Sequence, residues 1–165
     1  MKSLIQTIPA IGLIAVLSLT GCKQSMVISK VDYSQSIESV LTPNEDGVVR
    51  DVQHGLTFNI KPLQYAEMQD TSSVTTSQVR YIRGKEGFYY ITAPNYKNVY
   101  VMIPEKGRLK LEKKLKISET GLEQPALNQR TSHIQLINQS SGEAWKLNPE
   151  SVEKQESQMA NKQEK

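Results

Sequence analysis

The sequence predicts a mainly β protein, either a small antiparallel β-sandwich or a partly open barrel, with an N-terminal export signal and a polar C-terminal tail. Two observations carry this prediction. Short runs rich in β-branched and aromatic residues alternate with turn residues over most of the chain, and no stretch shows a convincing apolar stripe with helical spacing. The length of 165 residues suits one domain with a single core, and we find no internal repeat.

Residues 1–21 have the organisation of a secretory signal peptide. Lys2 places a positive charge near the start, and residues 4–19 are mostly Ile, Leu, Val and Ala with no charged side chain. Polar and helix-breaking residues interrupt this run, so its apolar length falls short of the roughly 20 residues of a transmembrane helix. We therefore expect a cleaved signal rather than a permanent membrane span.

Cys22 is the only cysteine, and it follows the apolar run directly. A disulfide within one chain is therefore excluded, and a catalytic thiol at the end of an export signal would lack a positioned base. The stretch Leu19-Thr20-Gly21-Cys22 resembles the lipobox of bacterial lipoproteins. The resemblance implies a diacylglyceryl group on the Cys22 thiol, cleavage before this residue and an N-acyl chain on its new amino group; we expect no other cofactor.

The lipid would decide where the protein resides. Two or three acyl chains on one residue hold a protein at a membrane for its lifetime. In the sorting rule that this family follows in enterobacteria, Asp after the cysteine retains a lipoprotein in the inner membrane, so Lys23 implies the outer membrane, facing the periplasm of a Gram-negative bacterium. Cleavage removes Lys2 and lowers the formal net charge from +3 to +2, a balance that argues against nucleic acid as a partner.

We divide the mature chain into a tether over residues 22–30, a β domain over 31–148 and a tail over 149–165. In the first half of the domain, residues 48–52 and 56–60 alternate apolar and polar side chains around His54 and Gly55, which predicts one bulged strand or two short ones. Residues 42–47 predict a turn before them. Residues 73–83 predict a further strand, whose pattern is more regular from Val79 onward.

The strongest local pattern is a meander. Residues 88–92 and 98–103 are rich in aromatic and β-branched side chains, and the loops at 84–87 and 93–97 contain Gly, Pro and Asn. Residues 108–117 place Leu109, Leu111, Leu115 and Ile117 at odd positions, which predicts a strand with all four side chains on one face.

The C-terminal part predicts a loop, a hairpin and a tail. Residues 118–132 contain Gly, Pro and several amides and predict a long loop with room for one helical turn at 122–127. Residues 133–137 and 144–147, separated by a turn-rich segment, predict a closing hairpin. Residues 149–165 are rich in Gln, Glu and Lys, which predicts a disordered tail or a frayed helix.

Two surfaces are candidates for binding. Arg108, Lys110, Lys114 and Lys116 share the even face of their strand and could contact anionic headgroups, lipopolysaccharide phosphates or an acidic partner. The alternative is a solvated face whose lysines discourage pairing between strand edges. Five tyrosines lie within twenty residues, and we expect Phe88 and Tyr90 in the core, with Tyr96 and Tyr100 as possible stacking positions for a sugar or peptide and Tyr96 the most exposed.

Catalytic and metal-binding motifs are not found in the sequence. The two histidines, His54 and His133, have no ligand spacing, and the acidic turn at 44–47 lacks the ligand series of a calcium loop. No nucleophile elbow, zinc-protease motif or phosphate-binding glycine loop is present. We therefore expect neither a metal site nor an enzyme.

These features predict a lipid-anchored envelope lipoprotein that acts as a non-enzymatic assembly or interaction subunit with an envelope protein partner. The alternative is a β-type module that binds lipid, glycan or peptide. The two hypotheses differ in shape, because assembly predicts a flat patch or an exposed strand edge and ligand binding predicts a concave apolar pocket lined by tyrosines. An enzyme acting on cell-wall material would need Asp, Glu or His to converge in a cleft.

Overall fold

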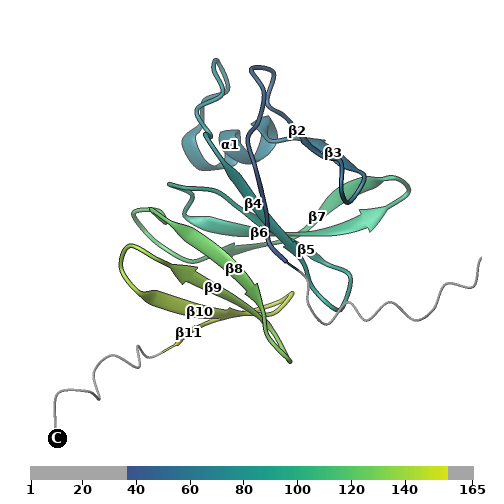
Figure 1. The fold of residues 1–165 in the computed structure, drawn as a ribbon. Coiled ribbons are helices and arrows are strands. Elements are labelled where there is room, and N and C mark those ends of the chain that lie inside the picture. Colours follow the sequence, from purple (N-terminus) through teal and green to yellow (C-terminus); the bar gives the residue numbers. More distant parts are fainter. Residues whose placement is uncertain (1–36, 156–165) are drawn as a thin grey trace, which may run out of the picture. The chain divides into compact units, whose positions relative to one another are not determined.

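The computed structural model describes residues 37–155, which form antiparallel β-sheets and one helix (Figure 1). The signal peptide, Cys22 and the tether lie outside these residues, as do residues 156–165. The elements are β1 Ser39–Leu41, β2 Val48–Asp51, β3 Leu56–Asn59, α1 Lys61–Met68, β4 Val79–Arg83, β5 Tyr89–Thr92, β6 Asn98–Glu105, β7 Arg108–Lys116, β8 Pro125–Gln129, β9 Ile134–Asn138, β10 Glu143–Leu147 and β11 Val152–Gln155.

The strands form three sheets. The central sheet has five strands in the order β1-β4-β5-β6-β7, and the C-terminal sheet has four in the order β11-β10-β9-β8. The third is the two-stranded hairpin β2–β3. Every pairing is antiparallel, and no sheet in the described part of the chain closes into a barrel. The predicted mainly β class is confirmed, and of the two predicted architectures the structure is consistent with the small β-sandwich.

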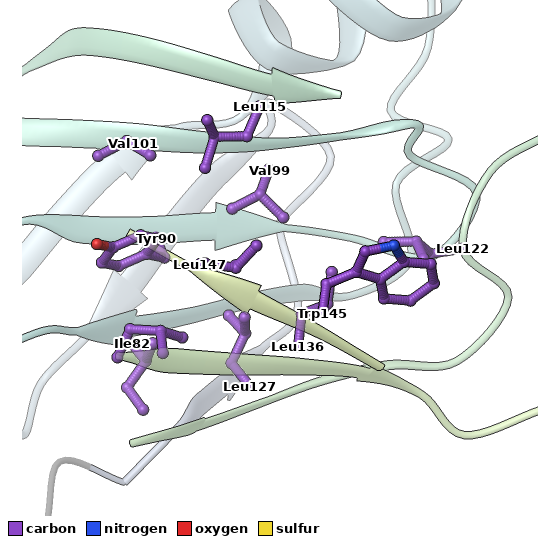
Figure 2. Close-up of a cluster of buried hydrophobic side chains, with 11 residues drawn as sticks. Ile82, Tyr90, Val99, Val101, Leu115, Leu122, Leu127, Leu136, Trp145 and Leu147 are labelled. Carbon is purple, nitrogen blue, oxygen red and sulfur yellow. The ribbon is translucent and has the colours of Figure 1, made fainter. Parts of the chain in front are cut away.

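The C-terminal sheet packs on one face of the central sheet. Figure 2 shows Val99, Val101 and Leu115 from β6 and β7 facing Leu136 and Leu147 from β9 and β10. Trp145 lies at one side of this core, beside Leu122 from the loop before β8. The predicted core position of Tyr90 is confirmed, and Phe88 packs partly buried against the same cluster.

The opposite face of the central sheet carries a second core, beneath the hairpin β2–β3 and α1 (Figure 1). It contains Val49 and Ile60 from the covering layer and Tyr81, Ile91 and Tyr100 from the sheet. Because both faces of the central sheet are covered, consecutive residues of β5 are buried, which explains why this strand is apolar on both sides.

Helix α1 was not predicted. Its eight residues include Pro62 in the first turn, where a missing N–H costs nothing, and the chain leaves the helix through Gln69 at φ 59°. The side chain that it buries completely is Gln64, which is polar. The helix therefore has no apolar stripe that a sequence pattern could reveal. In the described part of the chain, no helix is long and apolar enough to cross a bilayer.

The prediction that Leu109, Leu111, Leu115 and Ile117 share one face is wrong. The register between β6 and β7 shifts between Val101 and Met102, so that Val101 pairs with Lys113 and Met102 with Leu111. Glu112 is the extra residue of a β-bulge, and a bulge exchanges the faces of the residues beyond it. Leu115 and Ile117 therefore pack on the side of the C-terminal sheet, and Leu109 packs on the opposite side.

Two further predictions need correction at the C-terminal end. Residues 125–129 form β8 rather than part of a loop, and residues 152–155 form β11 rather than a tail. In β11 the backbone pairs with β10, Val152 packs against the core, and Lys154 forms an ion pair with Glu143. A polar segment can complete a sheet in this way, because its neighbour supplies the backbone hydrogen bonds. The predicted meander and closing hairpin are confirmed.

Candidate functional site

A cleft of about 660 Å³ lies between the hairpin β2–β3 and the outer part of the central sheet. β3 and the start of α1 form one wall, and β5, β6 and β7 form the other. Most of the lining is apolar: Leu56, Phe58, Leu63, Tyr89, Ile91, Met102, Pro104 and Leu109. Both the volume and the apolar lining match those of small-molecule binding sites, which typically measure roughly 300–1,000 Å³.

The cleft exists because the covering hairpin is shorter than the strands beneath it. β2 and β3 have four residues each, whereas β6 has eight and β7 has nine. The bulge at Glu112 turns Leu109 and Leu111 toward this face, where they pair with Pro104 and Met102. Leu111 remains 47% exposed. Part of an apolar sheet face is therefore left uncovered.

The charge of the lining has one sign. Arg108, at the start of β7, is the one residue of the lining with a permanent charge, and His54, in the turn between β2 and β3, can carry a positive charge. Among the described residues that line the cleft, none is Asp or Glu. The guanidinium of Arg83 lies 5.6 Å from the centroid of the Tyr89 ring and adds a second arginine beside the apolar wall.

Asp51 attaches the hairpin wall to the central sheet. It is 6% exposed, and its Oδ2 accepts hydrogen bonds from Tyr81 on β4, at 2.5 Å, and from Ser39 on β1, at 2.8 Å. The Nδ1 of His54 lies 2.9 Å from the same oxygen, and the His54 backbone N–H donates to Oδ1 at 3.0 Å. One carboxylate thus joins β2 and its turn to two strands of the sheet.

The same network determines the ionisation of its members. Burial alone would raise the pKa of Asp51, but hydrogen bonds from Tyr81, His54 and Ser39 outweigh it and hold the pKa well below its usual range. Burial and the bond to Asp51 raise the pKa of Tyr81, so its hydroxyl stays protonated and donates. Because an ionised carboxylate only accepts, the proton of a neutral His54 lies on Nδ1. Nε2 is then the acceptor nitrogen of this ring.

Ser39, His54 and Asp51 do not have the geometry of a hydrolytic triad. In a triad the serine hydroxyl bonds to Nε2 while the carboxylate bonds to Nδ1. Here the Ser39 hydroxyl donates to Asp51 and lies 3.5 Å from Nδ1, the same nitrogen that faces the carboxylate. This arrangement holds the cleft wall in place and does not activate the serine as a nucleophile.

The helix end of the cleft wall is attached by Glu67. Its Oε1 accepts hydrogen bonds from Asn98 and from the Tyr100 hydroxyl, both at 2.7 Å, and its Oε2 accepts from the Lys97 backbone N–H at 2.8 Å. The buried Gln64 bonds to the loop that follows α1, through the backbone of Ser73, Thr75 and Thr76 among others. The wall is therefore formed before any ligand binds.

The expectation of an exposed Tyr96 is wrong, and neither Tyr96 nor Tyr100 is available for stacking. The two side chains are 0% and 1% exposed, and their rings meet edge to face with centroids 6.3 Å apart. The Tyr96 hydroxyl lies 3.0 Å from that of Thr76, and burial raises the pKa of Tyr96 to about 12. Both rings fill the core beneath α1, and Tyr89 is the tyrosine that lines the cleft.

The predicted basic face on β7 is divided by the bulge. Lys114 and Lys116 pair with Tyr100 and Asn98, whereas Lys110 pairs with Ile103 and so faces the other side of the sheet. Lys110 forms an ion pair with Glu105, Lys116 forms one with Glu119, and the Lys114 ammonium lies over the Tyr100 ring. Arg108 is the one of the four predicted residues in the cleft lining, at the hairpin end of β7, and its pairing with Glu105 puts its side chain on the same face of the sheet as that of Lys110.

A second, smaller cavity of about 200 Å³ lies at one end of the sandwich core, lined in part by Tyr90, Gln129 and His133. The Gln129 Oε1 is buried and has no hydrogen-bond partner among residues 37–155. A cavity of this size has room for a water molecule, which would supply the missing hydrogen bond. Nowhere in residues 37–155 do three or more His, Cys, Asp or Glu side chains form a group that could hold a metal ion.

The comparisons with known proteins found no match to this chain among protein-family models, curated proteins or solved structures.

The cleft was not predicted from the sequence. Its lining comes from segments that are distant in sequence, and the Asp51–His54 pair was the one local signal, an acid three residues before a histidine at a predicted turn.

Proposed function

We propose that this chain is a lipid-anchored, non-enzymatic binding protein of the bacterial envelope, and that its cleft binds the apolar part of a ligand. The cleft is the observation that supports ligand binding, because it is concave, apolar and formed by the fold itself. The lipobox at Leu19–Cys22 supports the anchor. Together they favour the ligand-binding hypothesis over assembly through a flat surface.

Burial energies support an apolar ligand. Each methylene group that moves from water into an apolar site contributes about 0.8 kcal/mol, a factor of about four in affinity. The walls are held by Asp51 and Glu67, so little ordering has to accompany binding, and the contacts translate more directly into affinity. A preformed cleft of this volume can therefore hold an alkyl or aromatic group with useful strength.

The edge of β7 gives the assembly hypothesis less support. β7 is an edge strand of nine residues, which is the type of surface that a partner strand can extend. However, the bulge at Glu112 interrupts its ladder, and lysines occupy most of its exposed positions. Both features discourage pairing between strand edges.

The test is a titration with an environment-sensitive apolar dye. We expect the dye to bind the mature chain at one site and Met102→Gln to weaken binding about tenfold, because an amide would be desolvated against the apolar wall. Met68→Gln is the matched control, since Met68 is a partly exposed methionine on α1 outside the lining. Equal binding by the two variants, or no binding by the unaltered chain, would contradict the proposed function.

A further inference from the structure

The smaller cavity, at one end of the sandwich core, has the features of a second binding site. It lies on the side of the central sheet opposite the cleft, between the β4–β5 turn and the β8–β9 turn. Its inner wall includes the buried side chains of Tyr90, Ile134 and Leu147, and exposed residues of the two turns form its rim. Most of its lining side chains are polar, unlike those of the cleft.

Tyr90 gives the cavity an unused hydrogen-bond donor. The register places Tyr90 opposite Ile82 and Val101, which both belong to the sandwich core, so its side chain points to this side of the sheet. Its hydroxyl forms no hydrogen bond with any of residues 37–155. Burial and the nearby Glu86 carboxylate raise the pKa of Tyr90, so the hydroxyl stays protonated and can donate.

Gln129 supplies the complementary acceptor. On β8 it follows Leu127 by two positions and pairs with Ile134, so its side chain also points into the sandwich. Its Nε2 donates to two backbone carbonyls of the turn that follows, at 2.6 and 3.4 Å. The buried Oε1 is left without a donor among the residues that the structure describes. Because a buried acceptor without a donor is costly, the cavity favours a ligand that can donate.

The lining has no excess of charge. Lys85 and Glu86 are the charged side chains among its described residues, one base and one acid. Burial lowers the pKa of His133 from its ordinary value of 6.5, so its ring is neutral at pH 7. An ionic ligand would lose hydration here without gaining a counter-charge. The cavity therefore suits a neutral ligand.

The volume of the cavity, about 200 Å³, sets the size of the ligand. An engineered cavity of about 150 Å³ in another protein binds benzene, so this cavity has room for one six-membered ring with substituents. Gly84 keeps part of this space open. A Cβ atom at this position would lie 3.2 Å from Cε2 of Tyr90 and 3.9 Å from Cδ1 of Ile134, between two side chains of the lining.

We propose that this cavity binds one neutral sugar ring, whose hydroxyl groups accept a hydrogen bond from Tyr90 and donate one to Gln129. Each sugar hydroxyl both donates and accepts, whereas an apolar ring of the same size would leave both protein groups unpaired. The sugar is either a free monosaccharide or the end residue of a glycan, since both offer the same ring. This inference goes beyond the proposed function, because it concerns a site on the other side of the central sheet.

The experiment is a titration of the mature chain, residues 22–165 with Cys22→Ser so that no detergent is needed, followed by NMR. The readout is the side-chain amide signal of Gln129, identified by its absence in Gln129→Glu. The ligands are glucose, galactose, mannose and N-acetylglucosamine. We expect at least one of them to shift this signal saturably, with a dissociation constant on the order of 1–10 mM. Cyclohexanol, a ring of the same size with one hydroxyl, should bind at least about tenfold more weakly.

Variants then test the two contacts and the space. Tyr90→Phe removes a hydroxyl without a partner in the described chain, so the urea midpoint should stay unchanged while the affinity for the sugar falls about fivefold. Tyr65→Phe is the matched control, because Tyr65 is 52% exposed and lies outside the lining. Gly84→Ala places a methyl group between Tyr90 and Ile134 and should also weaken binding at least about fivefold.

Three results would overturn the inference. If none of the four sugars shifts the Gln129 signal saturably, the cavity holds water only. If cyclohexanol binds as tightly as the best sugar, or Tyr90→Phe binds it unaltered, the polar contacts do not select the ligand. If glucuronate or glucosamine binds more tightly than the neutral sugars, the site selects charge instead.

The source of the sugar and the separation from the cleft are tested with the same protein. Methyl glycosides that bind as tightly as the free sugar indicate the end of a glycan, and weaker binding indicates a free monosaccharide; either result supports the inference. The sugar should leave the apolar dye bound in the cleft. Displacement of the dye by the sugar would contradict a second site, whereas failure of the dye to bind affects the proposed function alone.

Discussion

At the scale of single residues, Asp51 joins the hairpin β2–β3 to the central sheet. It is a buried charge, which is normally unfavourable, yet three side-chain donors and a backbone N–H surround it. Ser39 lies on β1, Tyr81 lies on β4, and His54 lies in the hairpin turn. The carboxylate of Asp51, on β2, therefore connects β1, β2 and β4. This carboxylate attaches the hairpin end of the cleft wall to the central sheet.

Replacement of Asp51 by Asn tests this role. Asn keeps the size of the side chain but loses the charge and one acceptor, so the hydroxyls of Tyr81 and Ser39 no longer both bond to an ionised oxygen. We expect the free energy of unfolding to fall by about 2 kcal/mol, measured by urea denaturation at pH 7. Asp46→Asn is the control, because Asp46 is exposed and its replacement should change stability by less than about 0.5 kcal/mol.

The pH dependence of the stability of Asp51→Asn distinguishes a loss of charge from a packing defect. The pKa of Asp51 is lower in the folded state than in the unfolded chain, so its contribution is complete above the unfolded pKa of about 3.9 and is lost as the pH falls below it. The stability difference between the wild type and Asp51→Asn should therefore shrink from about pH 5 to pH 2. A constant difference over that range would assign the effect to shape instead of charge.

The tyrosines show what residue-level patterns can and cannot predict. Tyr90 was placed in the core because it lies in a strongly β-forming run, and the structure agrees. Tyr96 was expected to be exposed because it lies in a loop beside Pro94, yet α1 and its following loop cover it. Whether a loop residue is buried depends on which distant segment packs over it, and local sequence does not contain that information.

At the scale of elements, the bulge in β7 decides which face of the sheet each leucine of the strand occupies. The single extra residue at Glu112 lets Leu109 and Leu111 lie on the sheet face that bears the cleft, where Leu109 is part of the lining, and leaves Leu115 in the sandwich core. A strict period of two had predicted one face for all of them. A bulge leaves no mark in the alternation of apolar residues except one irregular position, which here was Lys113.

Deletion of Glu112 would restore the regular ladder. If residues 113–116 keep their pairing with β6, Leu111 still pairs with Met102 and Leu109 with Pro104, so both leucines keep their face of the sheet. We therefore expect the deletion variant to bind the dye within about twofold of the unaltered chain, with a change in stability of at most about 1–3 kcal/mol, measured by urea denaturation. Glu112→Gln keeps the bulge and should change neither quantity. A loss of dye binding by the deletion variant, with its fold checked by circular dichroism, would contradict the assignment of Glu112 as the extra residue.

At the scale of the whole molecule, the central sheet separates two cores. One core packs the C-terminal sheet against the central sheet, and the other packs the hairpin β2–β3 and α1 against its opposite face. The first core involves strands that pair with their sequence neighbours. The second one places residues from β2, α1 and the loop after β5 on a single sheet face, and the cleft opens where that layer ends.

The anchor is tested on the whole precursor. Cys22→Ser should move the protein from the membrane fraction to the soluble periplasmic fraction and abolish incorporation of labelled palmitate, because the thiol carries the diacylglyceryl group in the lipoproteins that the lipobox resembles. Lys23→Asp is the informative control, since it should keep the lipid but change the membrane in which the protein resides. A Cys22→Ser protein that stays in the membrane with unchanged electrophoretic mass would contradict lipid anchoring.

By itself, the sequence determined the β class, the meander β5–β6 and the hairpin β9–β10, because alternation and turn chemistry act between neighbouring residues. The lipobox at Cys22 is equally local, and anchoring stays a prediction. Only the tertiary structure decided that residues 61–68 are helical, that the polar segment 152–155 completes a sheet, and that the bulge places Leu109 in a cleft. These outcomes depend on contacts between residues that are far apart in the chain. A local sequence pattern contains no information about such contacts.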